Sequence, residues 1–282
     1  MEARDVGGGV RDYERIKVER DGPVERITLS YPERRNAIGP LMTSELLYAL
    51  EDARADAEVR VIVITGEGKS FCAGGDFAQM TGEDTSAVAP QRGPGEEAEP
   101  PKLAARGDYA GLLLALAKSS KPVIARVNGA AMGGGLGIVA ASTFAIASSD
   151  ATLGTPEIQV GLFPMMIMAV LARLVPRRRL LEMMLLGEKM DAAEAARIGL
   201  VGQVVAPGEL DAAVKTLAAR LSASSPMTMA LGLRAYAAQE DRELEEALPM
   251  LRDRLAECLG TDDAREGLTA FLEKRKPIWT GK

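Results

Sequence analysis

Two runs of aliphatic residues constrain the fold of this chain more than any other feature. Residues 59–66 read VRVIVITG and residues 122–127 read PVIARV, so both are dominated by Val and Ile. Strands without apolar–polar alternation are buried on both faces, as in parallel sheets covered by helices. A glycine-containing turn follows each run. The sequence therefore predicts an α/β fold built on a parallel sheet.

The remaining patterns fit this fold class. Residues 13–19 and 24–30 alternate apolar and polar positions around the turn signal RDGP, which predicts a β-hairpin. A strand is expected over 143–150, and LVGQVV at 200–205 is a further strand candidate. Apolar residues at helical spacing predict helices over 41–56, 103–118, 133–141, 165–174, 177–186, 191–197, 209–222, 226–239, 242–259 and 262–274.

These elements indicate a gradual change near residue 206 from an α/β core to a helical region. We expect a flexible N-terminus over 1–12, an α/β core over 13–206 and a helical region over 207–282. Residues 82–102 are rich in Pro, Gly and acidic side chains without periodicity, which predicts a mobile loop. A tolerated surface insertion and a flap over a site are both consistent with that loop.

Composition excludes several classes of function. The 282 residues contain no histidine, which removes Ser-His and Cys-His catalysis and histidine metal sites. We expect no metal, and acid–base work then falls to other groups, a carboxylate above all. The net charge of −6 argues against nucleic-acid binding, which needs a basic face. Two cysteines, Cys72 and Cys258, make no disulfide framework and fit a reducing compartment.

No segment predicts membrane insertion. The N-terminal residues are charged and lack the apolar stretch of a signal peptide. The most apolar segment, residues 161–175, contains Pro164 and Arg173 and is too short to span a bilayer. We expect a cytoplasmic protein without a membrane partner.

Two glycine-rich turns are the first candidates for a functional site. The segment CAGGD at 72–76 and the segment GAAMGGGLG at 129–137 each follow a buried strand. Neither matches a dinucleotide or P-loop fingerprint. Glycine lets a ligand approach the backbone, and a helix beginning near Gly133 presents free N–H groups. Two such turns at neighbouring strand ends predict an oxyanion hole that polarises a carbonyl.

A third candidate is Glu157, in the segment LGTPEIQVGLFP at 153–164. A glutamate near a helix start is commonly a solvated surface residue. Here it lies on a loop after a strand and close in sequence to the glycine-run helix. Cys72 lies beside the first glycine turn, and without a histidine to activate it we expect a buried, unreactive thiol.

Four motifs in order resemble the crotonase superfamily, also called the enoyl-CoA hydratase/isomerase family, over roughly residues 13–280. They are KSFCAGGDF, the stretch ARVNGAAMGGG through GTPEIQVGLFP, LLGEKMDAAEAARIGLVGQVV and GLTAFLEKRKPIW. The resemblance implies a spiral of ββα units followed by a helical trimerisation region, and a homotrimer or homohexamer. It also implies an acyl-CoA thioester substrate, with coenzyme A as part of the substrate and no separate cofactor.

The resemblance also implies roles for particular residues. The N–H groups of Gly75 and Gly134 match the two oxyanion donors, Glu157 matches an acid–base glutamate, and Asp76 matches an aspartate of structural role. The loop RRNAIGP matches a CoA-binding loop, and the C-terminal segment matches one that reaches toward CoA, sometimes across a subunit boundary. Implied substrate and CoA contacts are Arg34, Arg35, Ala37, Ala73, Gly75, Asp76, Phe77, Gly133, Gly134, Phe271 and Lys274.

The chain departs from the family pattern at one position. Hydratases of this family carry a second glutamate three residues after the second oxyanion glycine, and here that position is Gly137. Enoyl-CoA hydration is the leading expectation. Migration of a 3-enoyl double bond, which needs a single base, is a close alternative, and a weakly catalytic acyl-CoA-binding homologue is a third. RNA binding, known for a relative of the family, conflicts with the acidic composition.

Overall fold

The computed structural model describes residues 11–76 and 103–282. Its larger sheet has the strand order β1-β2-β3-β5-β7-β10. These strands are β1 (Ile16–Asp21), β2 (Val24–Leu29), β3 (Val61–Gly66), β5 (Val123–Val127), β7 (Phe144–Ser148) and β10 (Gln203–Val205). Strands β1 and β2 form the expected antiparallel hairpin, and every other pairing is parallel. The predicted α/β class is confirmed.

A second, smaller sheet was not predicted from the sequence. It has the order β4-β6-β8-β9, with strands β4 (Ser70–Cys72), β6 (Ala130–Met132), β8 (Thr152–Gly154) and β9 (Lys189–Asp191). The first three strands run parallel, and β9 is antiparallel to β8. Each strand is three residues long, which is too short to carry a recognisable alternation. Residues that the sequence assigned to turns and helix boundaries therefore form this sheet.

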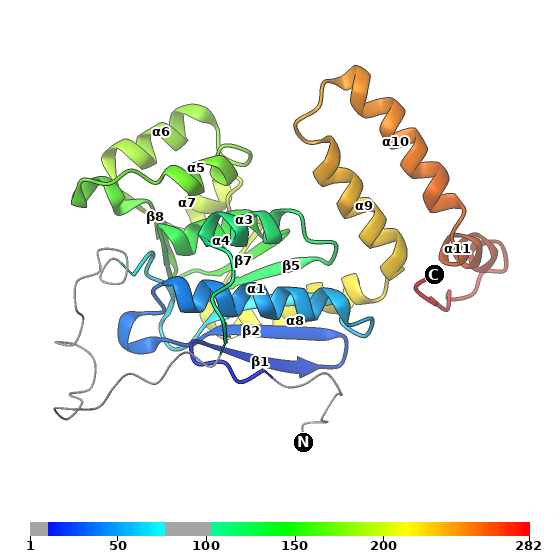
Figure 1. Cartoon of the computed structure of the whole chain (residues 1–282), viewed down its shortest axis with the longest axis horizontal. Coiled ribbons are helices and arrows are strands. Elements are labelled where there is room, and N and C mark those ends of the chain that lie inside the picture. The colour runs from blue at the N-terminus through cyan, green and yellow to red at the C-terminus, as the bar shows by residue number, and fades with distance from the viewer. Residues whose placement is uncertain (1–10, 77–102) are drawn as a thin grey trace.

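Helices cover the sheets in the first part of the chain (Figure 1). They are α1 (Pro40–Ala55), α3 (Tyr109–Ala117), α4 (Gly134–Ala141), α5 (Met165–Leu171), α6 (Arg177–Leu186), α7 (Ala192–Arg197) and α8 (Leu210–Ser222). The expectation of a helix from residue 103 is wrong, because α3 begins six residues later. Asp108 caps that helix by accepting a hydrogen bond from the N–H of Gly111, and Gly107 has φ +57°.

The larger sheet is buried on both faces, as its sequence indicates. Ile62 and Ile64 of β3 belong to the main core, which also holds residues of α1, α3 and α4. Val61 and Val63 of the same strand pack instead with residues of α8. Helix α8 falls within the region 207–282 that we expected to be a separate helical part, and it packs on the sheet of the α/β body.

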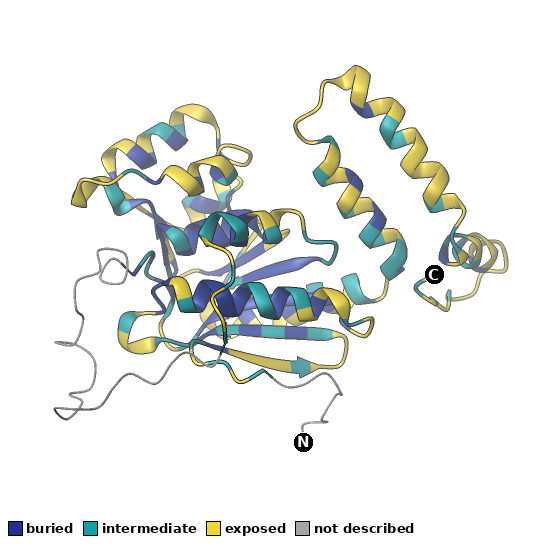
Figure 2. Cartoon of the chain, viewed as in Figure 1, coloured by how far each residue is buried: buried dark blue, intermediate teal, exposed yellow. Residues whose placement is uncertain are grey.

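The last three helices stand apart from that body (Figure 1). They are α9 (Pro226–Gln239), α10 (Leu244–Leu259) and α11 (Asp262–Leu272), and they contact one another. Figure 2 shows that α10 is mostly exposed. Large apolar side chains are exposed on this arm, namely Leu244, Leu248, Leu255, Leu259, Leu268, Phe271 and Leu272.

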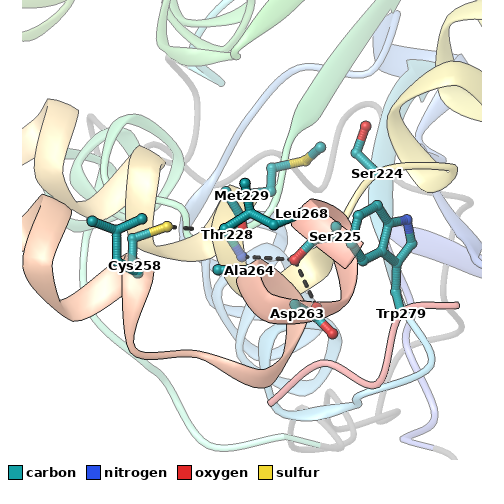
Figure 3. A pocket seen from close by; sticks show the side chains of 11 residues that line it. Ser224, Ser225, Thr228, Met229, Cys258, Asp263, Ala264, Leu268 and Trp279 are labelled. Atoms are coloured by element: carbon teal, nitrogen blue, oxygen red, sulfur yellow. Dashed lines mark hydrogen bonds between the residues drawn. The ribbon is translucent and has the colours of Figure 1, made fainter. Parts of the chain in front are cut away.

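A cavity of about 450 Å³ lies within this C-terminal arm (Figure 3). Buried Asp263 connects the segments around the cavity. It accepts hydrogen bonds from the hydroxyl of Ser225 at 2.6 Å and from the N–H groups of Thr280 and Gly281. The indole N–H of Trp279 donates to the carbonyl of Ala223. None of the glycine-turn residues or Glu157 lines this cavity. Its hydrogen bonds attach the end of the chain to α9 and α11.

In the described ranges, no helix has the length and apolar character needed to cross a membrane.

Candidate active site

The small sheet brings the three candidate segments to one edge. Strands β4, β6 and β8 are adjacent and parallel, with Cys72 opposite Ala131 and Met132 opposite Gly154. Their carboxyl ends are therefore aligned. The turn containing Gly75 follows β4, the triple glycine follows β6, and Glu157 follows β8 in a 3-10 turn, η3 (Pro156–Val160). Ligands of parallel sheets bind at such carboxyl edges.

The N–H of Gly75 points away from the neighbouring backbone of Ile38. Gly75 and Ile38 form a parallel bridge in which the N–H of Ile38 donates to Gly74 and the N–H of Asp76 donates to Ile38. Both bonds are made by the residues flanking Gly75, so its own N–H faces the other side. No hydrogen bond of the described residues uses that N–H. Gly75 is also partly exposed, which leaves the donor open to a ligand.

The triple glycine meets Gly75 at the start of α4. Gly133 has φ +48° and donates its N–H to the carbonyl of Gly154 at 3.0 Å. Gly134 is the first residue of α4, so helix geometry gives its N–H no acceptor within the helix. A Cβ built on Gly134 would lie 3.7 Å from the nitrogen of Gly75. The structure thus brings the two predicted donor residues together, in an arrangement that can polarise a carbonyl oxygen.

Glu157 lies against the same glycine run. A Cβ built on Gly133 would lie 2.7 Å from Oε1 of Glu157, so the carboxylate occupies the space that a side chain at residue 133 would need. The residue is half-buried, and its Oε2 is buried without a hydrogen-bond partner among the described residues. Burial raises the pKa of Glu157 above its ordinary value of 4.5. A partly desolvated carboxyl group of this kind is suited to accepting and returning a proton.

Residue 137 has no room for a second carboxylate. A Cβ there would lie 2.3 Å from the hydroxyl of Tyr109 and 2.4 Å from Cγ2 of Ile167. Tyr109 comes from α3 and Ile167 from α5, and the Tyr109 hydroxyl donates to the carbonyl of Gly134. The sequence analysis did not identify Tyr109. Nothing in its local pattern marks it, since its position depends on the packing of α3 on α4.

Cys72 is confirmed as a buried thiol. It is fully buried, and burial raises the pKa of its thiol to about 12. A Cβ on Gly135 would lie 2.6 Å from Cβ of Cys72, so these two residues allow α4 to pack closely on β4. The side chain is a packing element, and its burial disfavours the thiolate form that a nucleophile needs.

The predicted CoA-binding loop lies beside the Gly75 turn. The N–H of Ala73 donates to the carbonyl of Arg35 at 3.0 Å, and Ala37 is buried next to Ile38. Asp76 is buried, whereas Arg34 is partly exposed and Arg35 is exposed. Neither guanidinium pairs with a carboxylate among the described residues. Two cationic side chains therefore border the site.

The structure does not bring Phe271 and Lys274 to this site within the described chain. Phe271 and Lys274 are exposed at the end of α11, which stands away from α4 (Figure 1). Phe77 and the expected loop over 82–102 lie outside the described residues, as do most of the expected flexible residues 1–12. Arg11, at the edge of that segment, pairs with Asp52 of α1 at 2.6 Å.

Comparisons with known proteins identify the family of this chain. The enoyl-CoA hydratase/isomerase family model matches residues 19–282. This chain belongs to that family. The family members it resembles include the short-chain-enoyl-CoA hydratase of Clostridium acetobutylicum, 33% identical over 93% of this chain and 95% of that protein. The carnitinyl-CoA dehydratase of Salmonella typhi is 34% identical over 95% of this chain and 99% of that protein.

Solved structures of family members share the fold. The crystal structure of an enoyl-CoA hydratase from Mycobacterium smegmatis superposes with a TM-score of 0.83 at 31% identity, over 94% of this chain and 99% of the other. The predicted crotonase-like architecture is confirmed by this match. Within the described residues, no cluster of His, Cys, Asp or Glu side chains is arranged to hold a metal ion.

Proposed function

We propose that this family member acts on acyl-CoA thioesters, with the N–H groups of Gly75 and Gly134 as an oxyanion hole and Glu157 as the acid–base residue. The observation that carries the proposal is the convergence of these three residues at the carboxyl edge of β4, β6 and β8. A thioester carbonyl bound by the two N–H groups is polarised, which stabilises an enolate at the adjacent carbon.

Hydration of a 2-enoyl-CoA is the leading reaction. Glu157 takes a proton from a water molecule whose oxygen bonds to C3, and the electron pair of the double bond moves into the thioester as an enolate. The same carboxyl group then returns the proton to C2, which regenerates the carboxylate and gives a 3-hydroxyacyl-CoA. The names of two relatives, a hydratase and a dehydratase, support this assignment because they describe the same chemistry in its two directions.

Migration of a double bond from C3–C4 to C2–C3 is the second candidate. The observation that favours it is the crowding at Gly137, where Tyr109 and Ile167 leave no room for a second carboxylate. In this reaction Glu157 removes a proton from C2 and returns it to C4, while the two N–H groups hold the dienolate. One base suffices for both steps.

Product analysis separates the candidates. The purified protein is offered a 2-enoyl-CoA and a 3-enoyl-CoA in parallel, and the products are identified by mass and by the position of the double bond. A 3-hydroxyacyl-CoA formed from the 2-enoyl substrate supports the hydratase. A 2-enoyl product from the 3-enoyl substrate supports the isomerase. Tight binding of both thioesters without turnover supports a weakly catalytic acyl-CoA-binding homologue.

The same proposal extends to the CoA portion and to assembly. Arg34 and Arg35 form no ion pair with the part of the chain that the structure describes, and their positive charge beside the Gly75 turn suits the phosphates of coenzyme A. Phe271 and Lys274 project from the exposed C-terminal arm, so we place them at a site only across a subunit boundary, in a homotrimer or homohexamer. The apolar exposure of the arm supports an assembled state.

A further inference from the structure

The N–H of Gly134 belongs to an unusually pliable piece of backbone. Gly133, Gly134 and Gly135 are consecutive, and glycine populates more backbone conformations than any other residue. An oxyanion donor is effective only when its N–H direction is fixed before the reaction. The peptide that carries this N–H is held within α4 by a hydrogen bond from the N–H of Gly137 to the carbonyl of Gly133 at 3.0 Å, and contacts from other elements hold the peptides on either side of it.

Two contacts hold the run from opposite ends. On one side, the N–H of Gly133 donates to the carbonyl of Gly154, which fixes the peptide to β8. On the other side, the hydroxyl of Tyr109 donates to the carbonyl of Gly134. The Tyr109 ring packs against the main core, and α3 contacts both α4 and α1. The second contact thus ties the backbone of residue 134 to a rigid part of the molecule.

The chemistry of Tyr109 suits a fixed donor. Burial raises the pKa of its hydroxyl well above 10, and the neighbouring Glu157 and Cys72 act in the same direction. The hydroxyl therefore keeps its proton at neutral pH. Its proton is directed at the Gly134 carbonyl, and the carbonyl is 25 positions away in sequence.

Tyr109 also controls the space beside the helix. A Cβ on Gly137 would meet the Tyr109 hydroxyl at 2.3 Å, whereas a Cβ on Gly134 would meet it at 3.6 Å. The hydroxyl thus lies over the first turn of α4, close enough to residue 137 to bar any side chain there. Its partner in this crowding, Ile167, is fully packed in the main core.

We propose that Tyr109 is a positioning residue of the active site: its hydroxyl clamps the Gly134 carbonyl, which with the Gly137-to-Gly133 bond fixes the direction of the Gly134 N–H, and it fills the space in which a side chain at residue 137 would stand. The clamp rests on the proposed function, because it acts through the Gly134 donor. It explains how a run of three glycines can present a preorganised N–H group.

Tyr109→Phe tests the clamp, since it keeps the ring and removes the hydroxyl. We expect kcat to fall about tenfold, which is less than the ~10²–10³-fold lost when an oxyanion donor itself is removed. KM should stay within about twofold, because the contacts to coenzyme A are untouched. A bound conjugated thioester, cinnamoyl-CoA, should show a smaller shift of its absorption to long wavelength than with the native protein, because its carbonyl is less polarised.

Ser142→Ala is the matched control. Ser142 follows the last turn of α4, at the end opposite the glycine run, and its hydroxyl donates to the carbonyl of Ile138 at 2.8 Å. This variant also loses one partly buried hydroxyl-to-carbonyl bond on α4, so a comparable fall in melting temperature is expected. Its kcat and its cinnamoyl-CoA absorption should equal those of the native protein.

Three results would overturn the clamp. They are a native kcat and a native absorption shift in Tyr109→Phe, a fall in kcat with no change in the absorption shift, and an equal fall in kcat in Ser142→Ala. The absorption shift separates this proposal from the proposed function. If the native protein shifts cinnamoyl-CoA but turns over no enoyl-CoA, the reaction assignment fails and the clamp is still decided by the two variants. If the native protein produces no shift, both fail.

Discussion

The two sheets of this protein differ in what they contribute to the hydrophobic core and to the candidate active site. The larger sheet is buried on both faces, and its residues occur in both hydrophobic cores. The smaller sheet adds Phe71, Cys72 and Leu153 to the main core, and its aligned carboxyl ends carry Gly75, the triple glycine and Glu157. The larger sheet therefore contributes to stability and carries no candidate site residue, whereas the smaller sheet contributes to both. Changes in the larger sheet should leave the chemistry largely intact.

The largest expected effect is a loss of turnover on substitution of Glu157, which follows β8 of the small sheet. Glu157→Gln keeps the shape of the side chain and removes its acid–base function. We expect turnover to fall at least ~10²-fold. The melting temperature should not fall, because Oε2 of Glu157 has no hydrogen-bond partner to lose. Steady-state kinetics and a thermal melt check both statements.

Glu58→Gln provides the control for that variant. Glu58 is exposed just before β3 of the larger sheet, away from the glycine turns. Its turnover should match the native value. A Glu157→Gln variant that retained the native rate would remove Glu157 from the mechanism.

A substitution in the larger sheet should have the opposite effect, lowering stability and leaving turnover unchanged. Ile124 of β5 is fully buried between the sheet and α8. Ile124→Ala should lower the free energy of unfolding by about 2–5 kcal/mol, and Ile124→Val by about 0.5–1.5 kcal/mol. Turnover per folded molecule should stay native in both, as measured by denaturant titration alongside kinetics. A loss of turnover without a loss of stability would contradict the division between the sheets.

Substitutions at the neighbouring residues Gly134 and Gly135 compare an effect on activity with an effect on packing. A Cβ on Gly134 meets nothing closer than 3.6 Å, so Gly134→Ala should fold normally and place its methyl group beside the N–H of Gly75. We expect kcat/KM to fall at least about tenfold as the thioester oxygen is displaced. A Cβ on Gly135 would lie 2.7 Å from the backbone oxygen of Cys72.

Gly135→Ala should therefore destabilise the fold by about 1–3 kcal/mol through overpacking. Melting temperatures and kinetics of the two variants should separate cleanly. Equal activity of Gly134→Ala and the native protein would show that the space beside Gly75 is not used by substrate.

The smallest expected effect concerns a buried acid of the larger sheet. Burial raises the pKa of Glu25 in β2 from 4.5 to about 7, although Arg20 lies 3.9 Å away and opposes the shift. The folded state therefore holds a proton that the unfolded chain releases between these pH values. Stability contributed by that proton is complete below pH 4.5 and is lost as pH rises through about 7.

Glu25→Gln should remove this dependence. The variant should be more stable than the native protein at pH 8, by on the order of 1 kcal/mol, and equal to it near pH 4. Unfolding titrations at the two pH values measure the difference. A variant whose advantage does not change with pH would show that Glu25 does not titrate in this range.

The two sheets also differ in how far the sequence predicts them. The Val- and Ile-rich runs identify β3 and β5 because burial on both faces leaves a composition that can be read directly. The glycine turns and Glu157 were predicted as a site from their order after strands and from the family motifs. Their spatial convergence depends on β4, β6 and β8, which are too short to leave a pattern.

Tyr109 shows a second limit of sequence reasoning. The sequence identifies the missing glutamate at residue 137, but not what stands in its place. That answer requires the packing of α3 and α5 against α4, which joins residues 28 and 30 positions away from Gly137 (137 − 109 and 167 − 137). Side-chain contacts over such separations follow from the whole fold and not from local spacing.

The most direct test of the account is the vibrational frequency of the thioester carbonyl in the bound state. An enoyl-CoA labelled with ¹³C at C1 is bound to the protein, and infrared difference spectroscopy compares its carbonyl band with that in water. Two N–H donors from Gly75 and Gly134 should lower the frequency, and Gly134→Ala should reverse most of that shift. A carbonyl frequency in the native complex equal to that in water would contradict the oxyanion hole and the function built on it.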